Sequence, residues 1–400
     1  MPTDAEDDPF FSLTDTSEWN ACIGVQAYDE NYVDGYTDAA LLLAETVITN
    51  KMYGSRDTIV FPILYNARHG VELTLKYLIK RLREAGLFNA EHAIDHDILS
   101  HWQFLTSQNL GDETLHSDLS RLEPYVQSLA NIDDDGQSFR YAERRDGQAS
   151  LGEHSLASIV VIRDSLRVLR GILEALKHRL WSFEEERKTG TFTAECSRLD
   201  LIAIAKALPA RDNWDSQDFL DAKASIMERF ALGSRKFSKA VDKIQSSREL
   251  KLIIGVQSEL AHLTDEHAEL VVEQWRRLHP DRRPREDDLG LDYRERSFSD
   301  IFKDDHPTSD VKEILLAALT NDEIADIDTI FYIGRDNQFG EHYETMLAAN
   351  QREHEVQGDR WIALYHVMSK TNFAQDLADG MDRLGRPELA ARVRGLAALT

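Results

Sequence analysis

Three charged residues at four-residue spacing, Arg68, Glu72 and Lys76, are the first feature of this sequence that could do chemistry. Side chains spaced in this way share one face of a helix, and His69 stands next to that face. The strip can be a solvated ladder of ion pairs, each worth about 0.2–0.5 kcal/mol. It can also be a polar seam inside a helical bundle, where burial requires that every charge is paired. Apolar residues surround the strip closely, so we favour the seam.

A second group of titratable residues lies in the segment 91–101, which reads Glu-His-Ala-Ile-Asp-His-Asp-Ile-Leu-Ser-His. His92 and His96 have the spacing that metal-binding helices use, but no third ligand stands at a matching distance along the chain. An aspartate ahead of a helix is a good N-cap, and Asp95 or Asp97 could serve. We therefore favour a capped helix with a structural histidine, and keep a titrating or catalytic histidine as the alternative. We expect no metal and no cofactor.

Arginines supply two further candidates for binding anions. Arg140 lies between Phe139 and Tyr141 in a turn-rich connection, where it can either anchor the loop or hold an anion. The other candidate is a local basic cluster that could meet phosphates, made of Arg276, Arg277, Arg282, Arg283, Arg285, Arg294 and Arg296. Acidic residues interleave with this cluster, so we favour a solvated linker there.

Apolar residues recur at three- and four-residue spacing along most of the chain, which predicts an all-α protein. The pattern predicts five helices in the first half, over residues 36–47, 59–82, 98–105, 115–129 and 156–183. In the second half it predicts helices over 199–208, 216–232, 235–245, 248–263, 266–278, 341–351, 361–380 and 386–396. A capping box at Thr320-Asn321-Asp322-Glu323 starts one more helix, for which Gly334 is a suitable C-terminal residue. Credible strands are almost absent, and the sequence has no glycine-rich phosphate loop, no Rossmann fingerprint after a strand, no nucleophile elbow and no zincin helix.

Shifts in composition divide the chain into five parts. Residues 1–30 form an acidic lead-in, expected to be partly disordered, and no Lys or Arg precedes Lys51. Residues 31–188 form a helical bundle with one decorated connection. A helical region at 197–278, a charged linker at 279–308 and a C-terminal helical region at 309–400 follow.

The composition limits the classes of protein to which the chain can belong. Of 400 residues, 42% are hydrophobic and 29% charged, which is typical of a folded globular protein. The formal net charge is -25, so long-range attraction to nucleic acid is not its general design. Cys22 and Cys196 are far apart, which favours two reduced thiols. No apolar run is long enough to span a bilayer and the start is not a secretory signal, so we expect a cytoplasmic protein without membrane contact.

The order of these features between residues 31 and 180 resembles the HEPN-like helical domains of bacterial defence and conflict systems. The resemblance is carried by Tyr36 with Ala39-Ala40, Phe61-Pro62-Ile63-Leu64-Tyr65, Arg68-His69, Glu72-Leu73, Lys76, His96-Asp97-Ile98-Leu99, Phe139-Arg140-Tyr141 and a long final helix. It covers a little over a third of the chain. The C-terminal half is faintly similar, around Phe331-Tyr332-Ile333-Gly334-Arg335-Asp336, to an uncharacterised bacterial helical domain, from which no function is carried.

The resemblance implies a bundle that often dimerises. In many members it also implies a metal-independent ribonuclease whose Arg-x4-6-His motif, near the last core helix, handles the 2′-hydroxyl and the phosphate. This chain departs from that motif, because Arg163, Arg167 and Arg170 lie too far ahead of His178. If the domain is catalytic, its set is Arg68, His69, Glu72, Lys76, His96 and Arg140. His69 or His96 would be the acid or base, and Arg140 or Lys76 the anion binder.

Two classes of function follow. The first is an effector of the anti-phage or toxin type that acts on RNA or nucleotides, and the second is a non-catalytic dimerisation or adaptor protein with a protein partner. The missing motif and the acidity favour the second, whereas the residual polar set favours the first. Partly exposed, converging side chains of His69, His96 and Arg140 would indicate chemistry. The same side chains buried and bonded to one another would indicate a scaffold.

Overall fold

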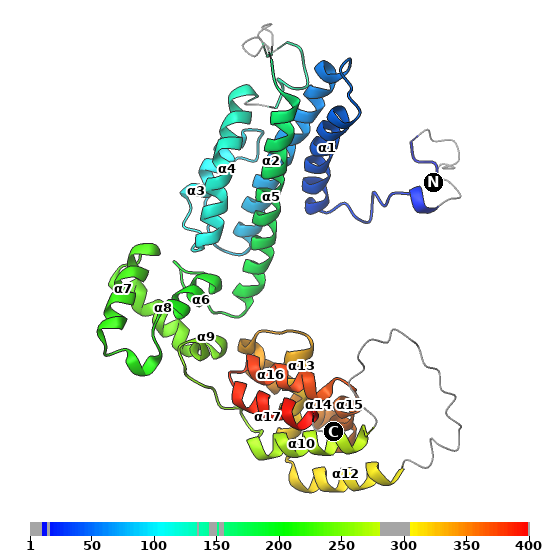
Figure 1. Cartoon of the computed structure of the whole chain (residues 1–400), viewed down its shortest axis with the longest axis vertical. Helices are drawn as coiled ribbons and strands as arrows, with labels where there is room; N and C mark the ends of the chain where they lie inside the picture. Colours follow the sequence, from blue (N-terminus) through cyan, green and yellow to red (C-terminus); the bar gives the residue numbers. More distant parts are fainter. Residues whose placement is uncertain are drawn as a thin grey trace. The chain divides into compact units, whose positions relative to one another are not determined.

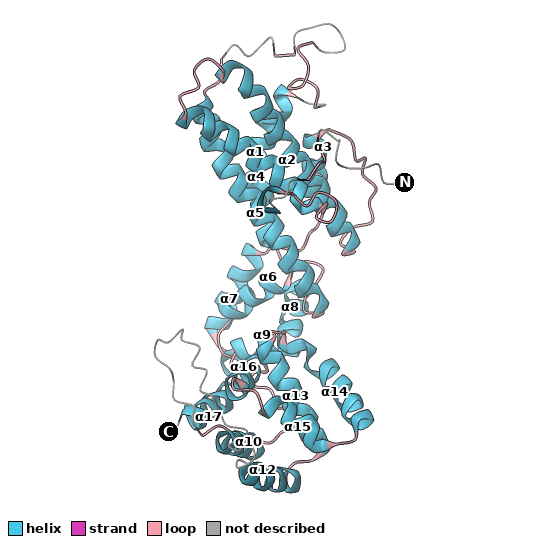
Figure 2. Ribbon diagram, turned by 90° about the vertical axis from the view of Figure 1, so that its right-hand side faces the viewer, coloured by secondary structure: helices cyan, strands magenta, loops and turns pink. Residues whose placement is uncertain are grey.

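The computed structural model describes residues 10–13, 17–133, 136–143, 150–151, 156–280 and 305–398, with the backbone alone at 305–307. Within these ranges the chain has sixteen α-helices, three short 3-10 helices and no β-strand (Figures 1 and 2), which confirms the all-α class. It divides into two compact units, Met1–Glu184 and Glu185–Thr400.

The first unit is a bundle built around its second helix. Its helices are α1 (Asp29–Thr49), α2 (Arg56–Glu84), α3 (Ile98–Ser107), α4 (Glu113–Ile132) and α5 (Ile159–Lys188), preceded by the 3-10 turn η2 (Ser17–Trp19). All five predicted helices are therefore confirmed. The apolar side of α2 lies fully inside the core, through Ile63, Val71, Leu75, Leu78, Ile79 and Leu82. Gly70 lets α1 approach α2 closely, because a Cβ there would collide with the Thr37 hydroxyl.

Local caps define where the shorter helices of this unit begin. The Asp97 carboxylate accepts a hydrogen bond from the Ser100 amide at 2.9 Å, which confirms Asp97 as the N-cap of α3. Asp112 caps α4 in the same way and also receives the Arg179 guanidinium of α5 at 2.7 Å. Both members of that ion pair are buried, so it joins the start of α4 to α5 inside the core.

In the described part of the second unit, eleven α-helices pack around two cores. Around the first core lie α6 (Arg198–Ala207), η3 (Arg211–Asn213), α7 (Gln217–Arg229), α8 (Ser234–Ser246) and α9 (Arg248–Ile253). Around the larger one lie α10 (Asp265–Leu278), α12 (Asp305–Ala318), α13 (Asn321–Arg335), η4 (Gly340–His342), α14 (Tyr343–Gln357), α15 (Arg360–Met368), α16 (Phe373–Arg383) and α17 (Pro387–Ala398). The capping box is confirmed, with Thr320 and Glu323 bonded reciprocally.

Two predicted helices are wrong in extent, each because tertiary contacts replace helical bonds. The helix expected over 248–263 ends at Ile253, ahead of Gly255 with φ +81°. Beyond it the buried Asp326 carboxylate accepts the amides of His262 and Leu263, at 2.9 and 2.8 Å. The helix expected over 361–380 is divided into α15 and α16. At this break the Trp275 indole donates to the Lys370 carbonyl at 3.1 Å.

Gly334 does not end its helix, contrary to the sequence-based expectation. It lies inside α13, where the helix crosses α16 at Gly380. A Cβ on Gly334 would overlap the Asp376 carbonyl, and one on Gly380 would overlap the Ile330 carbonyl. The two glycines therefore allow the backbones of α13 and α16 to touch.

Several sequence-based predictions concern residues outside the described part of the chain. These are most of the acidic lead-in and the charged linker, with Arg282, Arg283, Arg285, Arg294 and Arg296. Cys22 is an exposed free thiol and Cys196 a buried one. Among the described helices, none combines the length and the apolar character needed to cross a membrane.

We expect Gly380→Ala to lower the free energy of unfolding of the second unit by at least about 2 kcal/mol, because the added methyl meets rigid backbone. Gly395→Ala is the matched control. It lies in α17 with open space around its Cβ position, and alanine is the better helix former there. Urea denaturation, monitored by hydrogen exchange of the α13 and α16 peptides, measures the unfolding free energy of each variant. Equal stability of the two variants would contradict the close crossing.

Candidate functional site

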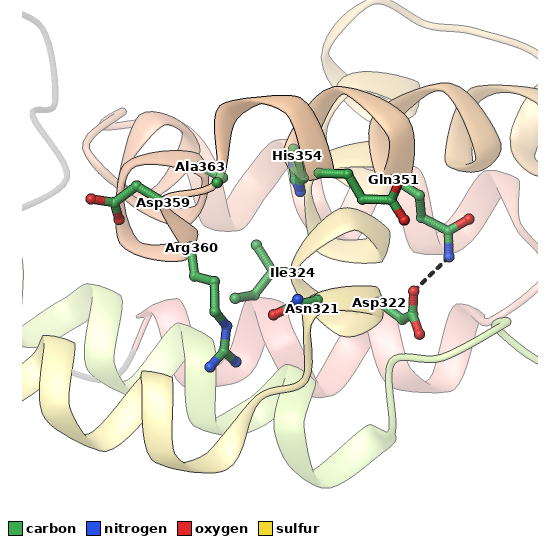
Figure 3. Close-up of a pocket in the computed structure, with 10 residues that line it drawn as sticks. Asn321, Asp322, Ile324, Gln351, His354, Asp359, Arg360 and Ala363 are labelled. Atoms are coloured by element: carbon green, nitrogen blue, oxygen red, sulfur yellow. Dashed lines mark hydrogen bonds between the residues drawn. The ribbon is translucent and has the colours of Figure 1, made fainter.

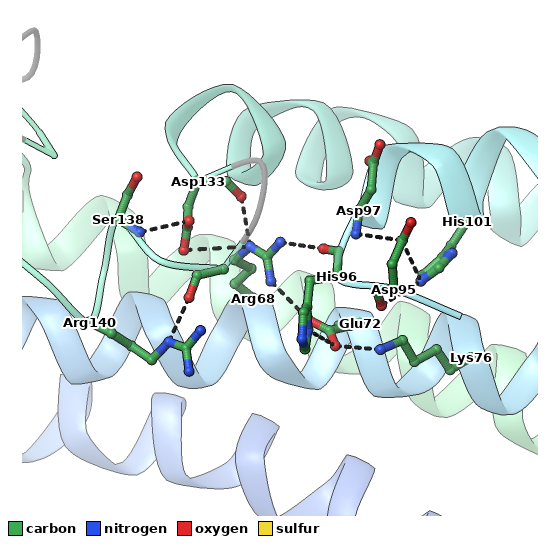
Figure 4. A network of polar contacts seen from close by, with 11 residues as sticks. Arg68, Glu72, Lys76, Asp95, His96, Asp97, His101, Asp133, Ser138 and Arg140 are labelled. Carbon is green, nitrogen blue, oxygen red and sulfur yellow. Dashed lines mark hydrogen bonds and ion pairs between the residues drawn. The ribbon is translucent and has the colours of Figure 1, made fainter. Parts of the chain in front are cut away.

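The Arg68 side chain is the centre of the polar seam (Figure 4). Its Nε donates to the Asp133 carbonyl at 2.7 Å and its Nη2 to the His96 carbonyl at 2.6 Å. Its Nη1 donates to Glu72 Oε2 at 2.9 Å. Arg68 is only 2% exposed. It therefore ties two loop segments, one ending α4 and one preceding α3, to the middle of α2.

Glu72 is the shared acceptor of the seam. Besides Arg68, its carboxylate receives Lys76 Nζ at 2.7 Å and His96 Nδ1 at 2.9 Å, both at Oε1. Burial pushes the pKa of Glu72 upward, but the hydrogen bonds from Lys76 and His96 outweigh it and the pKa is lowered. The charged carboxylate therefore stabilises the fold above its ordinary pKa of 4.5, and that stability is lost as pH falls through the lowered value.

The seam is buried at one side and open at the other. Arg68 and Glu72 lie inside, as the polar-seam interpretation expected, but the side chain of Lys76 is 20% exposed and that of His96 is 61% exposed. Since the ionised Glu72 can only accept, His96 carries its proton on Nδ1 when neutral, and Nε2 is the basic nitrogen. A carboxylate-held imidazole with an accessible second nitrogen is the arrangement of a general acid or base.

His69 lies apart from this seam, although the sequence grouped them. Its ring meets the edge of Tyr36 from α1 at 4.4 Å between centroids, and stacks on Tyr65 at 5.6 Å. Burial is the main cause that lowers its pKa. Since the described contacts include no hydrogen bond from His69 to the seam, we remove it from the acid–base pair.

Arg140 reaches the seam indirectly, through Gly136. Its Nε donates to the Gly136 carbonyl at 2.6 Å, and a Cβ on Gly136 would lie 3.1 Å from Arg68 Nη1. With φ +77°, Gly136 also has a backbone conformation that favours glycine. The exposed Arg140 guanidinium lies 5.8 Å from the centre of the Tyr65 ring. It is thus a loop anchor that still presents a cation to solvent.

The pair His92 and His96 does not share a helix, because the segment 89–97 is not helical. His92 Nε2 instead contacts Nδ1 of the buried His101 at 2.8 Å, and His101 Nε2 contacts the Asp95 carbonyl at 3.2 Å. Among the described residues, no group of three or more His, Cys, Asp or Glu is placed to hold a metal ion. His101 is therefore the structural histidine of this segment.

The second unit contains a hollow of about 460 Å³ that the sequence did not indicate (Figure 3). It lies where α13 and α15 begin and α14 ends. In its wall Gln351 donates to Asp322 at 2.8 Å, and His354 contacts Asp328 at 3.1 Å. Arg360, also in the wall, donates to the carbonyls of Leu316 and Leu319 at the end of α12. These polar groups are mostly committed to one another, so the hollow is a weaker candidate than the seam.

No protein-family model, curated protein or solved structure matches this chain. The resemblance to HEPN-like domains therefore stays a prediction. The geometry of the seam carries the functional argument that follows.

We expect Arg68→Met to cost about 3–5 kcal/mol of stability, because Glu72 would remain buried without its guanidinium partner. Arg167→Met is the control. It removes an ion pair with Glu45 whose side chains are 54% and 40% exposed, which should cost less than about 1 kcal/mol. The stability losses of both variants are measured from the midpoints of urea denaturation, monitored by hydrogen exchange of the α2 peptides. A small loss in Arg68→Met would contradict its role as a buried clamp.

Burial lowers the pKa of His69 and of His101 below the ordinary 6.5. Below pH 6.5 the unfolded chain therefore binds these protons while the folded chain does not. The stability that these two groups contribute should be full above that pH and should fall as pH decreases below it. His101→Gln should flatten this slope of the unfolding free energy. Parallel slopes in the wild type and the variant would contradict the burial effect.

Proposed function

We propose that this chain is a cytoplasmic bacterial defence protein, of the anti-phage or toxin type, whose HEPN-like first unit cleaves RNA as a homodimer and without a metal. One observation carries the proposal: the buried Glu72 carboxylate holds His96 Nδ1 at 2.9 Å while the side chain of His96 is 61% exposed. Burying a carboxylate is costly, and this one orients an accessible imidazole.

The chemistry that suits this pair is transesterification within RNA. His96 Nε2 would take the proton of a 2′-hydroxyl, and the 2′-oxygen would bond to the adjacent phosphorus. The bond from phosphorus to the 5′-oxygen then breaks, leaving a 2′,3′-cyclic phosphate on one product. The departing 5′-oxygen takes a proton from solvent and becomes a hydroxyl on the other product.

A row of polar side chains that includes two cations supports a phosphate-bearing substrate. Figure 4 draws Arg140, His96 and Lys76 one after another along α2. Lys76 keeps part of its surface exposed and Arg140 is exposed, so both can contact phosphate oxygens. Arg68 is too deeply buried to touch a substrate and acts as a positioning residue. Without His69 and Arg68, the candidate catalytic residues are Glu72, Lys76, His96 and Arg140.

The alternative is a non-catalytic dimerisation or adaptor protein that binds a protein partner. It is favoured by the mutual bonding of Arg68 and Glu72 inside the bundle, which resembles a structural seam, and by the net charge of -25. In that case His96 would only fasten its loop to α2.

The two functions differ in whether purified full-length protein cleaves RNA in the presence of EDTA. If His96 is the acid or base, His96→Gln should reduce cleavage of an end-labelled RNA by about 10²–10⁴-fold. His178→Gln replaces an exposed histidine on α5 and should cleave like the wild type. Unchanged cleavage by a folded His96→Gln protein would overturn the assignment. No cleavage by the wild type would leave the adaptor function.

A further inference from the structure

Aromatic and cationic side chains beside the seam form a continuous series of ring contacts. Tyr36 meets His69 edge-on, and His69 stacks on Tyr65 with an angle of 12° between the planes. The Arg140 guanidinium then lies 5.8 Å from the Tyr65 ring and 5.7 Å from the Tyr141 ring. The series thus runs from the interface of α1 and α2 to the turn at 138–141.

This series is covered at one end and open at the other. Tyr36, His69 and Tyr65 are partly buried, whereas Arg140 is exposed and Tyr141 is 57% exposed. No described carboxylate forms an ion pair with Arg140, in a chain with 71 acidic residues. Among the described residues, an aromatic face and a cation are therefore presented together to solvent.

The open end is fixed to the same guanidinium as the proposed acid–base pair. Arg68 Nη2 holds the carbonyl of His96, and Arg68 Nη1 lies against Gly136, whose carbonyl holds Arg140. Figure 4 draws Arg140 and His96 along the same side of α2, so a ligand held by Arg140 would lie on the side where His96 is exposed.

Nucleobases are the ligands that this combination suits. Nucleobases stack on phenol rings and on guanidinium planes. In RNA each base belongs to a nucleotide whose phosphate attracts the cations Arg140 and Lys76. In a duplex the bases are already stacked on one another and are not available to a protein ring. Resting on the proposed function, we infer that Tyr141 and Arg140 form a stacking platform for an unpaired nucleotide, so that the substrate class is single-stranded RNA.

Binding without turnover tests the platform. In the full-length His96→Gln background, fluorescence anisotropy would follow a labelled 12-nucleotide oligoadenylate and a 12-base-pair RNA duplex. Tyr141→Ala should weaken binding of the single strand by about tenfold, while Tyr141→Phe should stay within about twofold. Tyr53→Ala removes a tyrosine that is 69% exposed on the turn between α1 and α2, and should have no effect.

Four results would overturn the platform: no RNA binding by the background protein, equal binding by Tyr141→Ala, an equal loss in Tyr141→Phe, or equal affinity for the duplex. Hydrogen exchange of α2 peptides checks that the variants stay folded. Failure of the proposed function looks different, because the wild type would bind the single strand through Tyr141 and not cleave it. Failure of the platform alone would leave cleavage dependent on His96 and binding independent of Tyr141.

Discussion

The first unit depends on one requirement, which is to satisfy the guanidinium of Arg68 away from water. Taking a charge out of water costs several kcal/mol, and an uncompensated buried charge is strongly destabilising. Arg68 is compensated by the Glu72 carboxylate on its own helix, by the buried Asp133 carboxylate at 3.6 Å, and by the backbone carbonyls of Asp133 and His96. The hydrogen bonds to Arg68 on α2 consequently position the two loops that contain Asp133 and His96. Neither of the two carbonyls lies inside a helix.

The geometry of the exposed pair follows from this arrangement. Oε2 of Glu72 is occupied by Arg68, so the other oxygen is left for Lys76 and His96. Because Arg68 also holds the carbonyl of His96, the imidazole is restrained at its backbone as well as at Nδ1. Such restraint at two points reduces the conformational freedom that a reacting group must otherwise lose. A structural ion pair and an oriented imidazole are therefore parts of one network, and the scaffold and acid–base interpretations share most of their contacts.

Helical spacing explains which parts of the site could be predicted. Arg68, Glu72 and Lys76 align because residues four apart share a face, and the apolar pattern placed that face in a bundle. His69 was grouped with them by sequence proximity, yet one residue turns a helix by about 100° and directs its ring to Tyr36. Asp133 was missed because its carbonyl and its carboxylate, 2.7 and 3.6 Å from Arg68 Nε, come from a loop far away in the sequence, which helical spacing does not indicate. The breaks after Ile253 and Met368 were missed for a related reason, since distant groups such as Asp326 and Trp275 bond the freed backbone.

The acidity of the chain is compatible with an RNA substrate because charges act locally in salt. At physiological ionic strength the screening length is about 8 Å, so most of the -25 charge does not reach the row along α2. Few phosphates can be contacted there, and the affinity gained by releasing counterions is correspondingly small. Stacking then has to supply much of the binding energy, and it does not depend on net charge. The short row along α2 beside the exposed Tyr141 would thus prefer nucleic acids that have an unpaired base within reach of His96.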